Sequence, residues 1–377
     1  MLTKADDYPI HQTPDPIASG ADRNFYDRYF FNGHSADGGL FFGAAFGVYP
    51  HLNIMDGAFA VAVDGVQHNL RVSRHMTGER TDTQAGPLSV QVVEPLKSIR
   101  VRVGENPHGI EADLTFHGRT HPLEEPRQRS LVNGRSLMDV TRMTQNGAWE
   151  GWIFVHGQRV EVRPDKVIGV RDRSWGLRLV GPAHPQPPVP RKAPQIMWLW
   201  APLLAADREI LFYAMETGTG DPLVQGAQIA MLQGGGEPEH MADAFADLEF
   251  RPGTREIART TLRLVRRRGR GEIRITLTPS RQNRLFLQGL GYGHQEWGHG
   301  YDKGETAVGY DSFEPGAVVT HAEPHLHPMW AHYQAQTEAE VAFPDGTRLT
   351  ARGTLEQLIL GDYAPAGLTG LTDPLST

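Results

Sequence analysis

The segment 167–176 combines a carboxylate with a neighbouring indole. It reads VIGVRDRSWG, an apolar strand pattern that runs into Arg171, Asp172 and Trp175. An aspartate in an apolar pocket has a raised pKa because desolvation disfavours its charged form, and Asp172 could then act as a general acid. Arg171 and Trp175 would position it or stabilise developing charge. The alternative is a structural turn in which Arg171 pairs with Asp172 and Trp175 fills the core.

A second group of titratable residues lies in the segment 289–300, GLGYGHQEWGHG. If this segment is a strand, His294 and Glu296 face the same side and can act on one ligand, since positions two apart share a face. Histidine titrates near neutral pH, which suits it to holding or relaying a proton. Tyr292 and Trp297 would bind an apolar substrate. The alternative is a glycine-rich edge strand with solvated polar groups.

Aromatic residues crowd the segment 24–47, which contains His34 and Phe42. Aromatic side chains in this number can line a cavity for an apolar ligand. His34 and Phe42 are therefore candidate substrate-binding residues. The alternative is that the aromatics form the core.

Four histidines, His321, His325, His327 and His332, suggest a metal site in the segment 321–332. The segment HAEPHLHPMWAH also contains two prolines, which favour a loop, and it lacks a glutamate soon after the His-x-His pair. A metal-dependent enzyme is thus an alternative, and the main expectation includes no metal and no cofactor.

Composition excludes several classes of protein. The 377 residues carry a formal net charge of −7, which disfavours a free-standing nucleic-acid binder. Cysteine is absent, so disulfides and thiolate chemistry are excluded. The most apolar run, 196–206, is too short to span a membrane, and residues 1–20 lack the pattern of a secretory signal. We expect a cytoplasmic protein whose partner is an apolar small molecule, with self-association into a homo-oligomer left open.

Short strand patterns separated by turn residues dominate the chain. Asp64-Gly65 between two such patterns indicates a hairpin. Only 24–31 and 237–246 look helical, and no alternation of strands and helices appears. The prolines of 181–194 indicate a linker between two antiparallel β domains, 1–180 and 195–377.

The two segments with candidate catalytic residues are similar to each other. DRSWG at 172–176 aligns with HQEWG at 294–298, which is weak evidence of an internal repeat. The segment VRDRSWG also resembles the R-D-H-S-W-G signature of bacterial proteins related to carotenoid 1,2-hydratase, a wider group of lipocalin-like two-barrel proteins. Asp172 matches the aspartate of that signature. Arg173 and Ser174 stand where the hydratases have His and Asn.

This resemblance extends from about Asn24 to about Ser312 through FFNGHSADG, VQHNLRVSR and YGHQEWGHG. It implies an all-β fold of two consecutive lipocalin-like barrels that bind apolar small molecules such as terpenoids, steroids or polyketides. It also implies hydratase or cyclase chemistry without an organic cofactor.

The leading hypothesis is a cofactor-independent enzyme of the hydratase, isomerase or cyclase type. Asp172 would be the general acid, His294 and Glu296 would hold or relay a proton, and Arg171 would assist. The second hypothesis is a non-catalytic carrier of an apolar ligand.

Overall fold

The computed structural model describes residues 4–11, 22–76, 79–132, 134–183, 195–232, 236–316, 318 and 328–373. Within these ranges the chain forms strands and short 3-10 turns, and it contains no helix of the length and apolarity needed to cross a membrane. The turns are η1 (Lys4–Asp7), η2 (Pro50–Leu52), η3 (Arg267–Gly269), η4 (Leu287–Leu290), η5 (Pro328–Ala331) and η6 (Ala364–Ala366). The expected all-β fold is confirmed.

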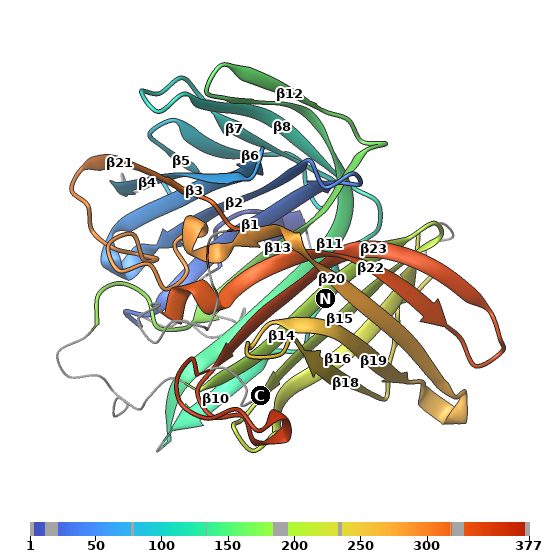
Figure 1. Ribbon diagram of the computed structural model, residues 1–377. Helices are drawn as coiled ribbons and strands as arrows, with labels where there is room; N and C mark the ends of the chain where they lie inside the picture. The colour runs from blue at the N-terminus through green and yellow to red at the C-terminus, as the bar shows by residue number, and fades with distance from the viewer. Residues whose placement is uncertain are drawn as a thin grey trace. The chain divides into compact units, whose positions relative to one another are not determined.

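The first sheet contains 14 strands, with β9, β10 and β12 paired to β11 beside a main path β21-β4-β3-β2-β1-β13-β11-β8-β7-β6-β5. Its strands are β1 (Phe25–Ser35), β2 (Leu40–Tyr49), β3 (Ile54–Val63), β4 (Val66–His75), β5 (Gln84–Ala85), β6 (Leu88–Glu94), β7 (Ser98–Val103), β8 (Ile110–Gly118), β9 (Leu123–Glu124), β10 (Gln128–Val132), β11 (Arg135–Val155), β12 (Gln158–Val162), β13 (Val167–Leu177) and β21 (Thr306–Phe313). The sheet curls so that β5 and β6 approach β3, which brings it close to a barrel (Figure 1).

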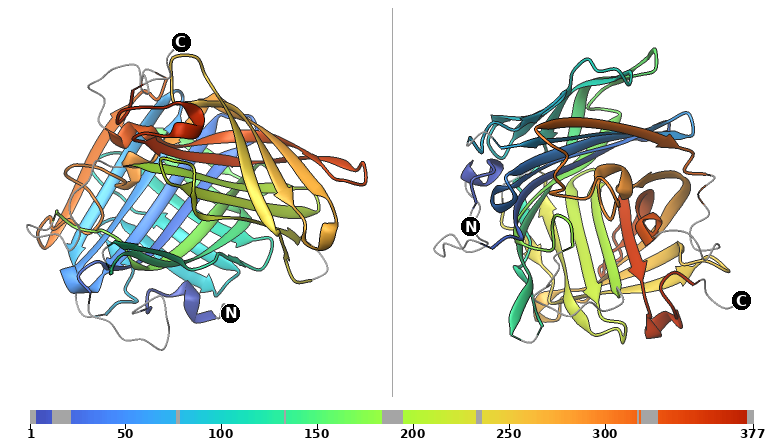
Figure 2. Two further views of the ribbon diagram at one scale, coloured as in Figure 1. Left: turned by 90° about the horizontal axis from the view of Figure 1, so that it is seen from below. Right: turned by 90° about the vertical axis from the view of Figure 1, so that its left-hand side faces the viewer.

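The second sheet contains nine strands in the order β17-β16-β15-β14-β23-β22-β20-β19-β18. They are β14 (Ile196–Ala205), β15 (Arg208–Glu216), β16 (Pro222–Met231), β17 (Glu239–His240), β18 (Asp243–Phe250), β19 (Ile257–Val265), β20 (Glu272–Phe286), β22 (His332–Ala342) and β23 (Arg348–Leu360). This sheet also curves, as the contacts between its outer strand β18 and β16 show (Figure 2).

The chain divides into two compact units, each of which contains one sheet. The first unit comprises Met1–Arg191 and Gly289–Phe313, and the second comprises Lys192–Gln288 and Glu314–Thr377. The segment 289–313 therefore returns to the first unit and adds β21 beside β4.

Two local expectations have different outcomes. The hairpin at Asp64-Gly65 is confirmed, and its two residues have the positive φ angles, 51° and 81°, of a tight two-residue turn. The expected helices at 24–31 and 237–246 are wrong. Both faces of β1 are buried, so its aromatic run shows no polar alternation. In β18 the inward positions recur every second residue, which is the period of a strand.

The first sheet has an apolar inner face that forms the core. This core includes Phe31, Phe42, Phe46, Phe59, Leu70, Val72 and Trp149. Because successive side chains alternate, the intervening residues of β1–β4, β11 and β13 point away from this core, and we call their surface the outer face. Every residue of β1 and β2 is buried, so the outer face is withdrawn from water along these strands as well.

Two predicted features fall partly outside the described residues. Residues 184–194 of the proline-rich linker and His321, His325 and His327 are among those that the structure does not describe. His332 is described and forms a hydrogen bond between its Nε2 and Glu356 Oε1 at 2.9 Å. Across the described ranges, no group of three or more His, Asp and Glu side chains is arranged to hold a metal ion.

Candidate active site

The outer face carries a row of buried and half-buried polar residues that crosses the strands. In the strand register, Arg28 of β1 lies beside Ser174 of β13 and Gly47 of β2, and Gly47 lies beside Asp56 of β3. The row continues to Ser73 of β4 and, on the other side, to Arg142 of β11. Arg28 is 2% exposed, and a buried charge in a position where an apolar residue would suffice for packing makes this row a candidate functional surface.

Gly47 has no side chain and therefore leaves room between the Arg28 guanidinium and the Asp56 carboxyl. A Cβ at this position would lie 2.3 Å from Tyr49 Oη. In the absence of a side chain, Tyr49 crosses the gap and donates its hydroxyl hydrogen bond to Asp56 Oδ1 at 3.1 Å. Arg28 lies within electrostatic range of both Tyr49 and Asp56.

The segment 289–301 lies over this row and is fixed to it by polar contacts. The backbone N–H of Gly300 donates to Asp56 Oδ2 at 2.6 Å, and Ser73 donates its hydroxyl to Tyr301 O at 3.3 Å. Arg28 Nη2 donates to Leu290 O at 3.0 Å. The loop thus positions its aromatic residues directly above the row.

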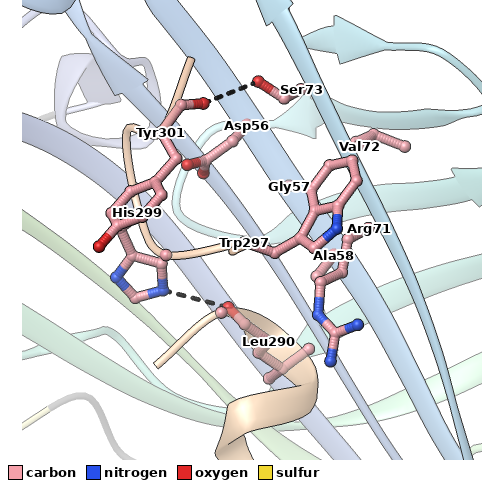
Figure 3. A pocket seen from close by; sticks show the side chains of 12 residues that line it. Asp56, Gly57, Ala58, Arg71, Val72, Ser73, Leu290, Trp297, His299 and Tyr301 are labelled. Atoms are coloured by element: carbon pink, nitrogen blue, oxygen red, sulfur yellow. Dashed lines mark hydrogen bonds between the residues drawn. The ribbon is translucent and has the colours of Figure 1, made fainter. Parts of the chain in front are cut away.

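A small pocket lies where this loop meets β3 and β4 (Figure 3). Its lining includes Asp56, Arg71, Trp297, His299 and Tyr301. The free space holds about one water molecule. It brings a carboxyl beside an imidazole and aromatic rings, and of these groups the carboxyl is one that can move a proton.

His299 is held as a neutral imidazole. Its Nδ1 accepts a hydrogen bond from Arg178 Nη2 at 3.1 Å, which requires that Nδ1 carry no proton. Its Nε2 donates to Leu290 O at 3.1 Å (Figure 3). Both ring nitrogens are therefore used to fix the loop, and the carboxyl of Asp56 is the titratable group best placed to exchange a proton in the pocket.

Burial raises the pKa of the Asp56 carboxyl to about 6. The Arg28 cation and the hydrogen bonds from Gly300 and Tyr49 oppose this rise without cancelling it. A carboxyl with a pKa near 6 is present in both protonation states around neutral pH, which suits general acid catalysis.

The raised pKa of Asp56 predicts a pH dependence of stability. Between the ordinary Asp pKa of 3.8 and the folded value of about 6, the folded state binds more protons than the unfolded state. The free energy of unfolding should therefore fall by about 3 kcal/mol as pH rises through this window. Asp56→Asn should lack this component, so urea unfolding of both proteins at pH 4 and pH 7.5 measures it. Parallel pH profiles for the two proteins would contradict the assignment.

Gly47→Ala should disturb the site through Tyr49. The new methyl group displaces the Tyr49 hydroxyl from Asp56, which removes a hydrogen bond that lowers the pKa of Asp56. We expect a loss of about 1–3 kcal/mol of stability and a further rise in that pKa. Thermal unfolding and a carboxyl titration measure the two effects. Gly104→Ala is the matched control, because the nearest atom to its Cβ is 3.7 Å away; equal effects of the two substitutions would refute the argument.

Asp172 lies on the same outer face, in the next row. It pairs with Phe30 in the register of β13 and β1, and its side chain is 14% exposed. Its Oδ2 is 3.7 Å from Arg142 Nε, and it is within electrostatic range of Arg28. Tyr292 also belongs to this region, since its ring lies under the Arg28 guanidinium at 4.8 Å.

Three other predicted residues point to the inner face instead. Phe42 packs edge-on against Trp149 in the core. Arg171 forms a buried ion pair with Asp7, and Trp175 stacks on His11. Strand alternation explains this separation, since residues 171 and 175 are each an odd number of positions from Asp172.

The segment 289–300 forms a 3-10 turn and loop rather than a strand. Consequently His294 and Glu296 do not share a strand face. His294 Nδ1 accepts the backbone N–H groups of Glu296 and Trp297, both at 3.1 Å, while the Glu296 side chain is exposed. His294 Nε2 lies 3.8 Å from Asp311 Oδ2. Burial opposes the shift, but the nearby His294 and the hydrogen bonds that Arg71 and Asn69 donate to the Asp311 carboxylate lower the pKa of Asp311.

His34 lies at the far end of the outer face, where it is 2% exposed and contacts Phe41 edge-on.

The residues that sequence reasoning missed are Arg28 and Asp56. Neither stands in a recognisable motif. The signal available was a lone Arg or Asp inside an otherwise apolar strand pattern, at a position that must be buried.

Several solved structures share this architecture. Kievitone hydratase from Nectria haematococca aligns over 88% of this chain and 88% of its own, with a TM-score of 0.52 and 11% identity. CghA in complex with Sch210972 aligns over 94% and 96%, with a TM-score of 0.53 and 12% identity. A candidate AttH from Nitrosomonas europaea aligns over 92% and 95%, with a TM-score of 0.51 and 12% identity. These likenesses confirm the lipocalin-like two-barrel fold.

Sequence comparison supplies the family. No curated protein matches the chain. The profile of a family of unknown function, DUF8625, matches residues 2–369. The chain therefore belongs to the DUF8625 family.

Proposed function

We propose that this protein is an enzyme of the hydratase or isomerase type that acts on an apolar, unsaturated small molecule through side-chain acid and base groups. The observation that carries this proposal is the Asp56 carboxyl, which lines a pocket under Trp297 and has a pKa raised to about 6 by burial. A pKa raised in this way keeps part of the carboxyl protonated near neutral pH, as a general acid requires.

Two carboxyl groups on one face allow a balanced proton transfer. In a hydration, protonated Asp56 gives its proton to one carbon of a C=C bond while water adds to the other carbon. The proton that water loses passes to the Asp172 carboxylate, which Arg142 holds nearby. Asp56 ends as a carboxylate and Asp172 as a carboxylic acid, and exchange with solvent restores both. In an isomerisation, Asp172 takes its proton from carbon instead.

The structural neighbours support the class of reaction and of ligand. One of them is named as a hydratase, and another was crystallised with a small molecule. Because these chains share 11% and 12% identity with this one, they support the fold on which such chemistry can be built. The proposed acid and base come from the geometry of the outer face.

Incorporation of deuterium from the solvent into substrate C–H positions tests the proposal. The full chain is incubated in D2O with a panel of unsaturated terpenoids, steroids and polyketides that includes kievitone, and the products are examined by mass spectrometry and NMR. We expect the protein to introduce solvent deuterium at a carbon of the substrate. A hydration also adds the mass of water to the product, and an isomerisation does not. Panel members that bind without any such exchange would favour a carrier of apolar ligands instead.

A further inference from the structure

Arg28 is a buried cation whose hydrogen-bonding capacity is largely unused. Its side chain is 2% exposed, and Nη2 donates to Leu290 O at 3.0 Å. Its Nε and Nη1 are buried and have no hydrogen-bond partner in the described part of the chain. Buried guanidinium groups normally use their planar set of N–H donors on carboxylates or other oxygens.

The neighbouring acids do not neutralise Arg28 directly. Asp56 and Asp172 are within its electrostatic range, yet Arg28 forms no ion pair with any described residue. Asp56 is instead bonded to Tyr49 and Gly300, and Arg142 lies beside Asp172. The positive charge of Arg28 is therefore not matched by a directly bonded carboxylate among the described residues.

Tyr26 adds a second unused donor on the same strand. It lies two positions before Arg28, so both side chains project from the outer face of β1. Tyr26 is 0% exposed, and its hydroxyl has no hydrogen-bond partner among the residues described. The guanidinium of Arg178 lies over its ring at 4.2 Å, which adds further positive charge at this position.

Within the described part of the chain, Arg28 and Tyr26 thus present buried donors without acceptors on one face of β1. We propose that Arg28 and Tyr26 bind a substrate oxygen that carries or develops negative charge, so the substrate is a conjugated ketone, an enol or a phenol. Tyr292, whose ring lies 4.8 Å from the Arg28 guanidinium carbon, would form one apolar wall of the site. This inference rests on the proposed function and adds the chemical class of the substrate.

The oxygen site completes the proton transfer for a conjugated ketone. Water adds to the β-carbon and loses a proton to the Asp172 carboxylate, and the electrons of the C=C bond move towards the carbonyl, whose oxygen becomes an enolate held by Arg28. Protonated Asp56 then delivers its proton to the α-carbon and re-forms the carbonyl. Donors aimed at the developing oxyanion lower the barrier because they need no reorganisation during the step.

Binding of 4-nitrophenol tests the oxygen site without knowledge of the substrate. The absorbance of the bound probe reports whether it is a phenol or a phenolate, and 4-nitroanisole is the matched probe that cannot ionise. We expect the full chain to bind 4-nitrophenol as phenolate at a pH where the free probe is protonated. Arg28→Met should weaken this binding by about 10–100-fold and abolish the ionisation shift. Tyr26→Phe should produce a smaller loss, and neither variant should change the binding of 4-nitroanisole.

The outcomes separate this inference from the proposed function. Absence of phenolate binding, or a shift that survives Arg28→Met, overturns the oxygen site. If Arg28→Met does not fold, as judged by circular dichroism, Arg28→Lys and Tyr26→Phe decide the question, since Lys retains the charge without the planar set of donors. Asp56→Asn should retain phenolate binding. If phenolate binds as expected while no panel compound gains carbon-bound deuterium, the oxygen site stands and the proposed reaction fails.

Discussion

Substitution of Asp56 by Asn should lower turnover by about 10²–10⁴-fold and leave the fold intact. Asn is nearly isosteric with Asp and retains an oxygen that accepts one of the hydrogen bonds that now reach Asp56 from Tyr49 and Gly300. It has no proton to deliver at neutral pH. The measurement is the rate of deuterium incorporation into carbon by the purified variant, with binding of the same substrate determined separately.

Asp64→Asn is the matched control for this substitution. Asp64 is exposed in the turn that follows β3, so the same chemical change there should leave turnover unaltered. Asp172→Asn should also lower turnover, because it removes the proposed proton acceptor. Wild-type turnover by Asp56→Asn would show that the acid lies elsewhere, and equal losses in Asp56→Asn and Asp64→Asn would point to a nonspecific effect of charge.

Asp7→Ala should destabilise the first unit by about 3–5 kcal/mol, because it leaves the Arg171 cation buried without its carboxylate. Asp7 and Arg171 are 0% and 1% exposed and form an ion pair on the inner face of the sheet. Gln145 holds the same guanidinium through a hydrogen bond from Arg171 Nε at 2.6 Å. Urea unfolding followed by near-ultraviolet circular dichroism measures the loss.

Two further variants show whether the loss comes from the unpaired charge. Asp7→Ala combined with Arg171→Met removes both charges, so the double variant should be more stable than the sum of the two single losses predicts. Arg100→Met breaks the exposed pair with Asp113 and should cost about 1 kcal/mol or less. Strict additivity of Asp7→Ala and Arg171→Met would mean that the pair contributes no coupling energy.

The sequence predicted the strands better than the positions of single side chains. Short strands, the Asp64-Gly65 hairpin and the absence of long helices from the described ranges followed from turn residues and local patterns. The buried strand β1 was misjudged over 24–31 because burial on both faces removes the alternation that identifies a strand.

The candidate site was predictable only in part, since it depends on register and on a long-range return of the chain. Asp172 and Tyr292 do lie on one face of the first unit, but the sequence offered no way to see that Arg28 and Asp56 would lie in one row. Gly47 lies between Arg28 and Asp56 and leaves the space that Tyr49 crosses. A single glycine in the sequence does not reveal this role. Strand alternation also turns Arg171 away from its neighbour Asp172.

The most direct test of the account is a titration of the Asp56 carboxyl by carbon-13 NMR, with Asp56→Asn used to assign its resonance. Burial under the loop 289–301 is the physical basis of the proposed acid, and it predicts a midpoint at about pH 6. That midpoint would establish a proton donor at the pocket around neutral pH. A midpoint near 3.8, the ordinary value for Asp, would contradict the proposed acid and with it the central claim.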